Sequence, residues 1–327
     1  SVETGAVGNG GNITISSGDF SLTDGGTLAA STSGQGNAGN ITIDVTGPVT
    51  IAGIKDGNPS AIFSFLGTGA VGTGGNITIS SGDFSLSDGA QLNASTLGQG
   101  NAGSVSVRAT NSVELVNGAI FSYVQAGGVG NGGNINITTG SFSLTDGAAL
   151  IASTLGQGNA GSVSVRATNS VELVNAYIFS DVESTGVGNG GNINITTGSF
   201  SLTDDAALIT STLGQGNAGS VSVRATNSVE LVNGNIFSTV QAGGVGNGGN
   251  ININAATLSL KDSAQLVTAV RKASSDQPGG RGNAGNVTID VTGPVTIAGI
   301  KDENPSAIFS SVETGAVGNG GNITISS

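Results

Sequence analysis

The chain repeats itself over its whole length, and this repetition limits the fold more than any local feature does. A strand-like segment follows each GG or AG dipeptide, and successive segments begin 28, 30 or 36 residues apart. Two kinds of unit alternate: one reads NITISSGDFSLTDG and the other SVSVRATNSVELVNG, and a pair typically spans 58 residues. A chain built in this way favours a fold in which each unit stacks on the one before it.

Each unit contains three short runs in which apolar and polar residues alternate, for example residues 13–15, 20–23 and 28–31. Gly, Asn and Asp, which tolerate turn conformations, separate these runs. The pattern predicts an all-β fold: a right-handed parallel β-helix (β-solenoid) with three strands per coil and about ten coils of 28–36 residues. Residues 1–327 are expected to form one continuous solenoid region.

Two polar columns are expected to have structural roles. The Asp residues at 24, 88, 146, 204 and 262 recur in alternate units at the same turn, which indicates turn formation rather than catalysis. An asparagine begins most first strands, and stacking predicts an amide ladder along the rod. The ladder residues are Asn12, Asn40, Asn76, Asn134, Asn192 and Asn250.

The third run of each unit carries an apolar column on its outward side. In residues 119–124, Ile120 and Val124 share the inward parity, so that Phe121 falls on the variable, outward parity. A bulge that turns the Phe residues inward is the alternative. The expected lateral-contact stripe consists of Phe63, Phe121, Ile151, Phe179, Ile209, Phe237, Val267 and Phe309.

Composition removes several kinds of chemistry. The chain has no His and no Cys, which excludes Ser/His/Asp and Cys/His nucleophiles, imidazole or thiolate metal sites, and disulfides. The formal net charge of -12 disfavours nucleic acid as a partner. No apolar run is long enough to span a membrane as a helix. We expect no catalytic residues, no resident cofactor and no enzymatic activity. The densest acidic patch, Asp181, Glu183, Asp204 and Asp205, leaves structural calcium as the alternative to a metal-free fold.

Basic residues follow the repeat as well. Arg108, Arg166 and Arg224 each precede a Glu by six residues, which predicts exposed Arg–Glu pairs. A basic binding stripe is not expected at this net charge. The segment 270–281 extends a short connection and is expected to be a solvated insertion, with a contact role as the alternative. Residues 55–60 and 301–306 are expected to be loops at one edge.

The first 17 residues recur identically as residues 311–327. We therefore expect the chain to be a window of a longer tandem array.

The alternation of GNGGNITI, FSLTDGA and GQGNAGS resembles the repeats of filamentous-haemagglutinin-like exoproteins of the two-partner secretion type, particularly cyanobacterial ones. The resemblance covers essentially the whole chain. It implies a right-handed β-helix that is exported to the cell surface and acts in adhesion and aggregation. The family's amino-terminal secretion domain has no recognisable counterpart in the sequence.

These observations predict an extracellular structural or adhesive fibre protein, a rod that self-associates end to end or laterally. Cell-surface glycans and other cells are the further partners expected. Two alternatives remain open: a carbohydrate-binding or polysaccharide-cleaving β-helix, and a calcium-dependent surface-layer protein.

Overall fold

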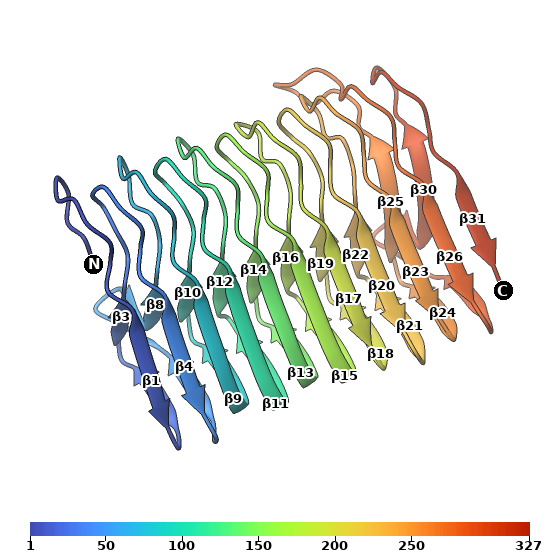
Figure 1. The fold of residues 1–327 in the computed structure, drawn as a ribbon. Helices are drawn as coiled ribbons and strands as arrows, with labels where there is room; N and C mark the ends of the chain where they lie inside the picture. Colours follow the sequence, from blue (N-terminus) through green and yellow to red (C-terminus); the bar gives the residue numbers. More distant parts are fainter.

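The computed structural model describes all 327 residues as one rod of stacked coils without any helix. In Figure 1 the nearer strands run down the page, the chain returns along the rear, and successive coils advance from left to right, so the winding is right-handed. The predicted parallel β-solenoid is confirmed. The structure contains no helix long and apolar enough to cross a membrane.

The first and second runs of every coil form one parallel sheet of 17 strands. In four consecutive coils the two runs merge into one long strand: β9 (Ile77–Ser87), β11 (Val105–Val116), β13 (Ile135–Thr145) and β15 (Val163–Val174). Elsewhere they stay separate, as β1 (Ile13–Ser17), β2 (Phe20–Thr23), β4 (Ile41–Val45), β5 (Val49–Ala52), β17 (Ile193–Thr197), β18 (Ser199–Thr203), β20 (Val221–Ala225), β21 (Ser228–Val232), β23 (Ile251–Ala255), β24 (Thr257–Lys261), β26 (Val287–Val291), β27 (Val295–Ala298) and β31 (Ile323–Ser326).

The third runs form a second parallel sheet of ten strands, one from each coil. They are β3 (Thr27–Ala29), β8 (Ala61–Phe63), β10 (Gln91–Asn93), β12 (Ala119–Phe121), β14 (Ala149–Ile151), β16 (Tyr177–Phe179), β19 (Ala207–Ile209), β22 (Asn235–Phe237), β25 (Gln265–Val270) and β30 (Ala307–Val312). The two segments expected to be loops are small antiparallel hairpins instead: β6 (Ile54–Lys55) with β7 (Asn58–Pro59), and β28 (Ile300–Lys301) with β29 (Asn304–Pro305).

Equivalent residues of successive units lie side by side. Val105 pairs with Ile77 on one side and with Ile135 on the other, and the same register continues along the rod. The second kind of unit has one extra residue between its first and second runs, which a register shift between Ala109 and Ser112 absorbs. Each position of the repeat therefore becomes a column parallel to the rod axis.

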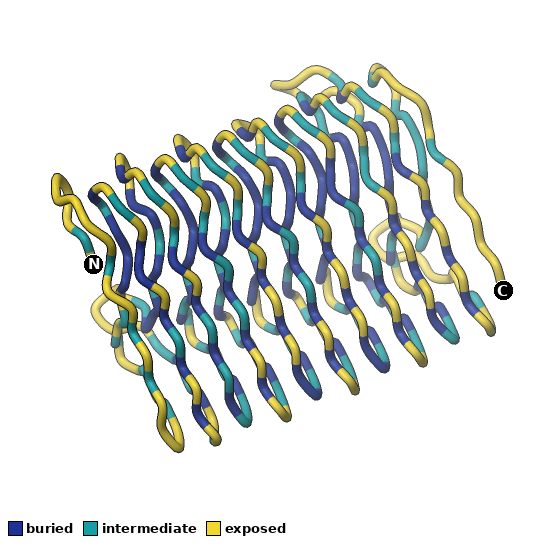
Figure 2. Tube along the Cα trace, viewed as in Figure 1, coloured by how far each residue is buried: buried dark blue, intermediate teal, exposed yellow.

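The core is a narrow filling of aliphatic columns, with Phe84, Phe142 and Phe200 as its largest side chains. Figure 2 shows that the buried segments recur at the same place in each coil, whereas the coils at the two ends of the rod are more exposed. Ile323 and Ile325, in the last strand, are 44% and 45% exposed because coil neighbours cover them on one side only.

The loops that close each coil are held by a column of glycines in which no side chain fits. A Cβ on Gly103, Gly133 or Gly161 would overlap the carbonyl oxygen of the glycine one coil earlier. The N–H of Gly161 donates to the carbonyl of Ala152 at 2.7 Å, which ties the loop to the end of β14 in the second sheet. The backbones of neighbouring coils thus approach at a distance that only glycine allows.

The predicted asparagine ladder is present, with a different geometry from the expected stacking of amides. The side-chain oxygen of Asn12 accepts from the backbone N–H of Asn40 at 2.8 Å, and that of Asn40 accepts from the N–H of Asn76. Serines occupy the rungs between the later asparagines, so that Ser104 accepts from the N–H of Asn134 at 3.1 Å. The column continues in this way through the remaining predicted residues, Asn134, Asn192 and Asn250.

A second ladder, which the sequence analysis missed, runs through the asparagines of the closing loops. Asn131 donates its backbone N–H to Asn101 at 2.8 Å, and Asn159 donates to Asn131 at 3.0 Å. Both ladders satisfy backbone donors at turns where the sheet pattern is interrupted.

The aspartate column has the turn role that was predicted. Asp24, Asp88, Asp146, Asp204 and Asp262 all have φ between 51° and 55°, in the left-handed region that Asp and Asn tolerate. Asn117, Asn175 and Asn233 occupy the same turn in the intervening coils, with φ of 47° to 53°.

Replacing Gly161 by Ala should separate two coils locally, because the new methyl group overlaps the carbonyl oxygen of Gly133. We expect a loss of several kcal/mol in the free energy of unfolding, in the upper range for single substitutions. Denaturant titration followed by circular dichroism measures this loss. Gly18→Ala is the matched control, since a Cβ at Gly18 meets no atom within 4 Å. Equal stability of the two variants would contradict the close-approach argument.

Replacing Thr154 by Val should stabilise the rod. The Thr154 hydroxyl is buried and has no hydrogen-bond partner, and Val124 and Val182 already occupy the same inward column in the coils on either side. Removal of an unsatisfied buried hydroxyl is worth about 1–3 kcal/mol, and valine has the same shape. The midpoint of thermal unfolding should rise; a fall would show that the hydroxyl has a partner.

Candidate functional site

The predicted lateral-contact stripe forms a continuous column on the outward side of the second sheet. Phe121 pairs with Asn93 and Ile151, and Phe179 pairs with Ile151 and Ile209, one coil apart at each step. The inward neighbours of the phenylalanines, such as Ile120 and Ile178, are fully buried. The period-2 prediction that the Phe residues face outward is therefore correct, and no bulge turns them into the core.

Most side chains of the stripe are partly buried by their neighbours and partly exposed to solvent. Phe63, Phe121, Phe179 and Phe237 are partly exposed, as are Ile151 and Ile209, while Phe309 is 41% exposed. Val267 is the exception, because it is only 1% exposed. Its short side chain lies between Phe237 and Phe309 in the adjacent coils, so the prediction that Val267 offers contact surface is wrong.

The surroundings of the stripe are almost free of charge. The outward positions two residues before it contain only uncharged residues, from Thr27 to Ala307, and those two residues after it contain a single charged residue, Asp181. Aromatic pairs reinforce this face: Phe121 lies 5.8 Å from Tyr123, and Phe179 stacks on Tyr177 at 5.7 Å. An apolar ridge without charges runs along a protein that is strongly acidic as a whole.

Asp181 lies beneath this face and is only 3% exposed. Burial raises the pKa of Asp181 to about 7, and the nearby charge of Glu183 acts in the same direction. Its Oδ1 atom has no hydrogen-bond partner. A side-chain hydrogen bond with Ser153 acts in the opposite direction, without cancelling the effect of burial. In the equivalent place two coils later, Thr239 shares a 2.8 Å hydrogen bond with Ser211.

A row of exposed valines on the closing loops was not predicted. Val71, Val129, Val187 and Val245 are 44–49% exposed. Glutamines 99, 157 and 215 alternate with them in the same column, so each valine is separated from the next by a long polar side chain. The recurring sequence VGNGG, which reads VGTGG at Val71, is the signal that could have indicated this row.

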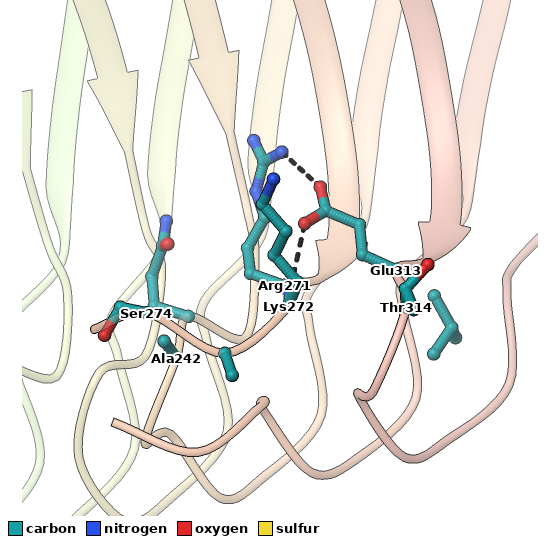
Figure 3. Close-up of a pocket in the computed structure, with 9 residues that line it drawn as sticks. Ala242, Arg271, Lys272, Ser274, Glu313 and Thr314 are labelled. Atoms are coloured by element: carbon teal, nitrogen blue, oxygen red, sulfur yellow. Dashed lines mark hydrogen bonds and ion pairs between the residues drawn. The ribbon is translucent and has the colours of Figure 1, made fainter. Parts of the chain in front are cut away.

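The insertion at residues 271–281 forms one wall of an open hollow of about 710 Å³. Figure 3 shows the Glu313 carboxylate reaching the Arg271 guanidinium, at 2.7 Å, and the backbone N–H of Lys272, at 2.9 Å. Partial burial alone would raise the pKa of Glu313, but these hydrogen bonds outweigh it and hold the pKa below its usual value. Glu313 thus anchors the insertion to the next coil, and most of the insertion is exposed.

Charged groups that are close in sequence lie apart in the structure. Asp181 and Glu183 follow β16 on the second sheet, whereas Asp204 and Asp205 form the turn before β19, so the four residues do not form one patch. No group of three or more Asp, Glu, His or Cys side chains gathers in metal-binding geometry. The Arg–Glu pairs do not form either, since the structure contains two ion pairs, Lys261–Glu230 and Arg271–Glu313. The arginines lie at the end of the first run, next to the bend, and the glutamates lie in the second run beyond the bend.

Comparisons with known proteins returned no match: no family model fits the chain, and no curated protein or solved structure is significantly similar to it.

Asp181 should make the stability of the rod fall as the pH rises. Because folding raises the pKa of Asp181, the folded chain binds this proton more tightly than the unfolded chain, and stability declines between about pH 4 and pH 7. Asp181→Asn should then be more stable than the parent at pH 8, by roughly 3–4 kcal/mol, and nearly equal to it at pH 4. Thermal melts of both proteins at the two pH values measure this. An equal effect at both pH values would show that Asp181 does not titrate in this range.

Proposed function

We propose that this chain is part of an extracellular, non-catalytic fibre protein, a β-solenoid rod that self-associates laterally to hold surface filaments or cells together. The rod provides length and stiffness, and the stripe on the second sheet provides the contact. The resemblance to filamentous-haemagglutinin-like repeats supports export and adhesion as the setting of this function.

The observation that carries the proposal is the uncharged ridge, which is in register from β8 to β30. It is apolar except at Asn93, and part of its surface is exposed in every coil except that of Val267. Contiguous exposed apolar surface on a water-soluble protein usually marks a contact surface. Rods with a net charge of -12 repel one another over most of their surface. The ridge is the face on which two copies can approach without bringing like charges together. The valine row is a weaker candidate because polar glutamines interrupt it.

Binding of a neutral glycan is the second candidate, and the aromatic pairs favour it. The rings of Phe121 with Tyr123 and of Tyr177 with Phe179 offer flat apolar surfaces on which sugar rings can stack. Asp181 is the one carboxyl group beside them, whereas general acid–base cleavage of a glycosidic bond uses a pair. This candidate is therefore binding without cleavage.

Electron microscopy of the parent protein and of a variant with Phe121, Phe179 and Phe237 changed to Ser tests lateral association. Bundled or sheet-like fibres are expected for the parent protein and single rods for the variant, since the substitutions remove the ridge and leave the inward residues Ile120, Ile178 and Ile236 in place. Circular dichroism checks that the variant keeps its β structure.

Two companion variants make the test specific. Asn136, Asn194 and Asn252 lie exposed on the first sheet, and changing all three to Ser should leave the bundles intact. Changing Val129, Val187 and Val245 to Ser examines the valine row. Bundles that persist without the phenylalanines, or that disappear only without the valines, would reject the stripe as the interface. Single rods in the parent protein, together with binding of soluble β-glucan that the phenylalanine variant loses, would favour the glycan candidate.

A further inference from the structure

A second surface feature lies away from the stripe, at the bend between the first and second runs of the coils. Three hollows follow one another along this bend, with volumes of about 540, 300 and 300 Å³. The first two share Thr138, and the last two share Thr196, Thr197 and Thr226. Shared walls join them into one groove, which we call the bend groove, running parallel to the rod axis from Asp44 to Thr292.

Each hollow of the bend groove contains one arginine: Arg108, Arg166 and Arg224. The three lie in a single column, separated by Thr138 and Thr196 in the intervening coils. Two coil steps place neighbouring guanidinium groups ~9.6 Å apart along the axis. All three side chains are exposed, and none has a carboxylate within ion-pair distance.

An acidic residue stands beyond each end of the arginine row in this column. Asp44 precedes the arginines by two coils and Asp290 follows them by two, with uncharged Ser80 and Asn254 between. The carboxylate of Asp83, farther along the same coil as Ser80, accepts hydrogen bonds from Ser112 and Asn111, which hold its pKa below the usual value. A third of the basic residues of an acidic chain are thus gathered in one groove, where Asp44 of the first hollow is the one acidic residue in the lining.

One wall of the bend groove supplies hydroxyl groups. Thr110, Thr168 and Thr226 stand exposed along one side. No aromatic residue lines any of the three hollows.

We propose that the bend groove binds a linear acidic polysaccharide along the rod axis. The arginines would each pair with one carboxylate or sulfate, and the threonine hydroxyls would hydrogen-bond the sugar hydroxyls between them. One coil step matches the length of one sugar residue in an extended chain, so that the arginine row fits an anionic group on every second sugar. The spacing of the arginines along the rod thus matches the spacing of the anionic groups along the polysaccharide.

The composition of the bend groove favours a glycan over a nucleic acid. Single-stranded nucleic acids bind proteins through aromatic side chains on which the bases stack, and the bend groove offers none. The separation of the cations also matters, because nucleic acid carries a phosphate at each residue, whereas the bend groove provides a cation at every second coil.

Affinity measurements with four immobilised probes test the proposal: hyaluronan, kappa-carrageenan, neutral dextran and single-stranded DNA. Hyaluronan carries a carboxylate, and kappa-carrageenan a sulfate, on every second sugar. The parent protein should bind hyaluronan or kappa-carrageenan at low salt, and should bind neutral dextran and DNA at least tenfold more weakly. Affinity should fall steadily with added salt, because bound polyanions release counterions. Binding to hyaluronan alone assigns the groove to carboxylates, and binding to kappa-carrageenan alone assigns it to sulfates.

The groove variant has Arg108, Arg166 and Arg224 changed to Gln, and it should lose roughly tenfold or more in affinity for the anionic glycan. The matched control changes Lys55, Lys272 and Lys301 to Gln. These three are exposed, lie outside the bend groove and make no ion pair, so this variant has the same net charge. An equal loss of affinity in the two variants would show that net charge alone determines binding, and would overturn the proposal. Absence of binding by the parent protein would overturn it, as would DNA binding that matches glycan binding and disappears with the arginines.

Discussion

The structure depends on the approach of one glycine backbone to the next at the loops that close each coil. Gly103, Gly133 and Gly161 leave no room for a Cβ, so neighbouring coils lie at the spacing of strands in a sheet even where no sheet is formed. A larger spacing here would lengthen the hydrogen bonds of both asparagine ladders, such as the one of 2.8 Å from Asn131 to Asn101. This contact fixes the spacing of the coils, and with it the register of both sheets and the stacking of the aliphatic core.

Constant register turns each repeat position into a line along the rod, and the alternation of two kinds of unit gives many lines a period of two coils. The phenylalanines of the stripe, the exposed valines and the arginines of the bend groove all follow this period. Surfaces with quite different chemistry are thereby presented with the same spacing on separate sides of one rod. The apolar ridge suits a second copy of the rod, whereas the arginine row suits a polymer with regularly spaced anions.

Much of this arrangement could be predicted from sequence because it follows from alternation within a strand and from turn chemistry. The outward position of Phe121 and the left-handed conformation of Asp146 are of this kind. The burial of Asp181 and Val267, the unpaired state of Arg166 and the bend groove itself depend on how sharply the coil bends and on the size of side chains one coil away. The alternation of residues within a strand carries no information about how sharply the coil bends. Ser104 could be identified as a ladder member only after the backbone showed that a hydroxyl and an amide oxygen accept the same hydrogen bond.

The strict alternation of the two units has a consequence for how such a rod can change in length. Insertion or deletion of a two-coil block leaves every interface between unlike units as it was, since each kind of unit still meets the other. Loss of a single coil that lies between two arginine-bearing coils would instead place two like units in contact, with Arg stacked directly on Arg at ~4.8 Å in the bend groove. Electrostatic repulsion therefore disfavours the loss of one such coil, whereas a change of two coils keeps the spacing of the arginines.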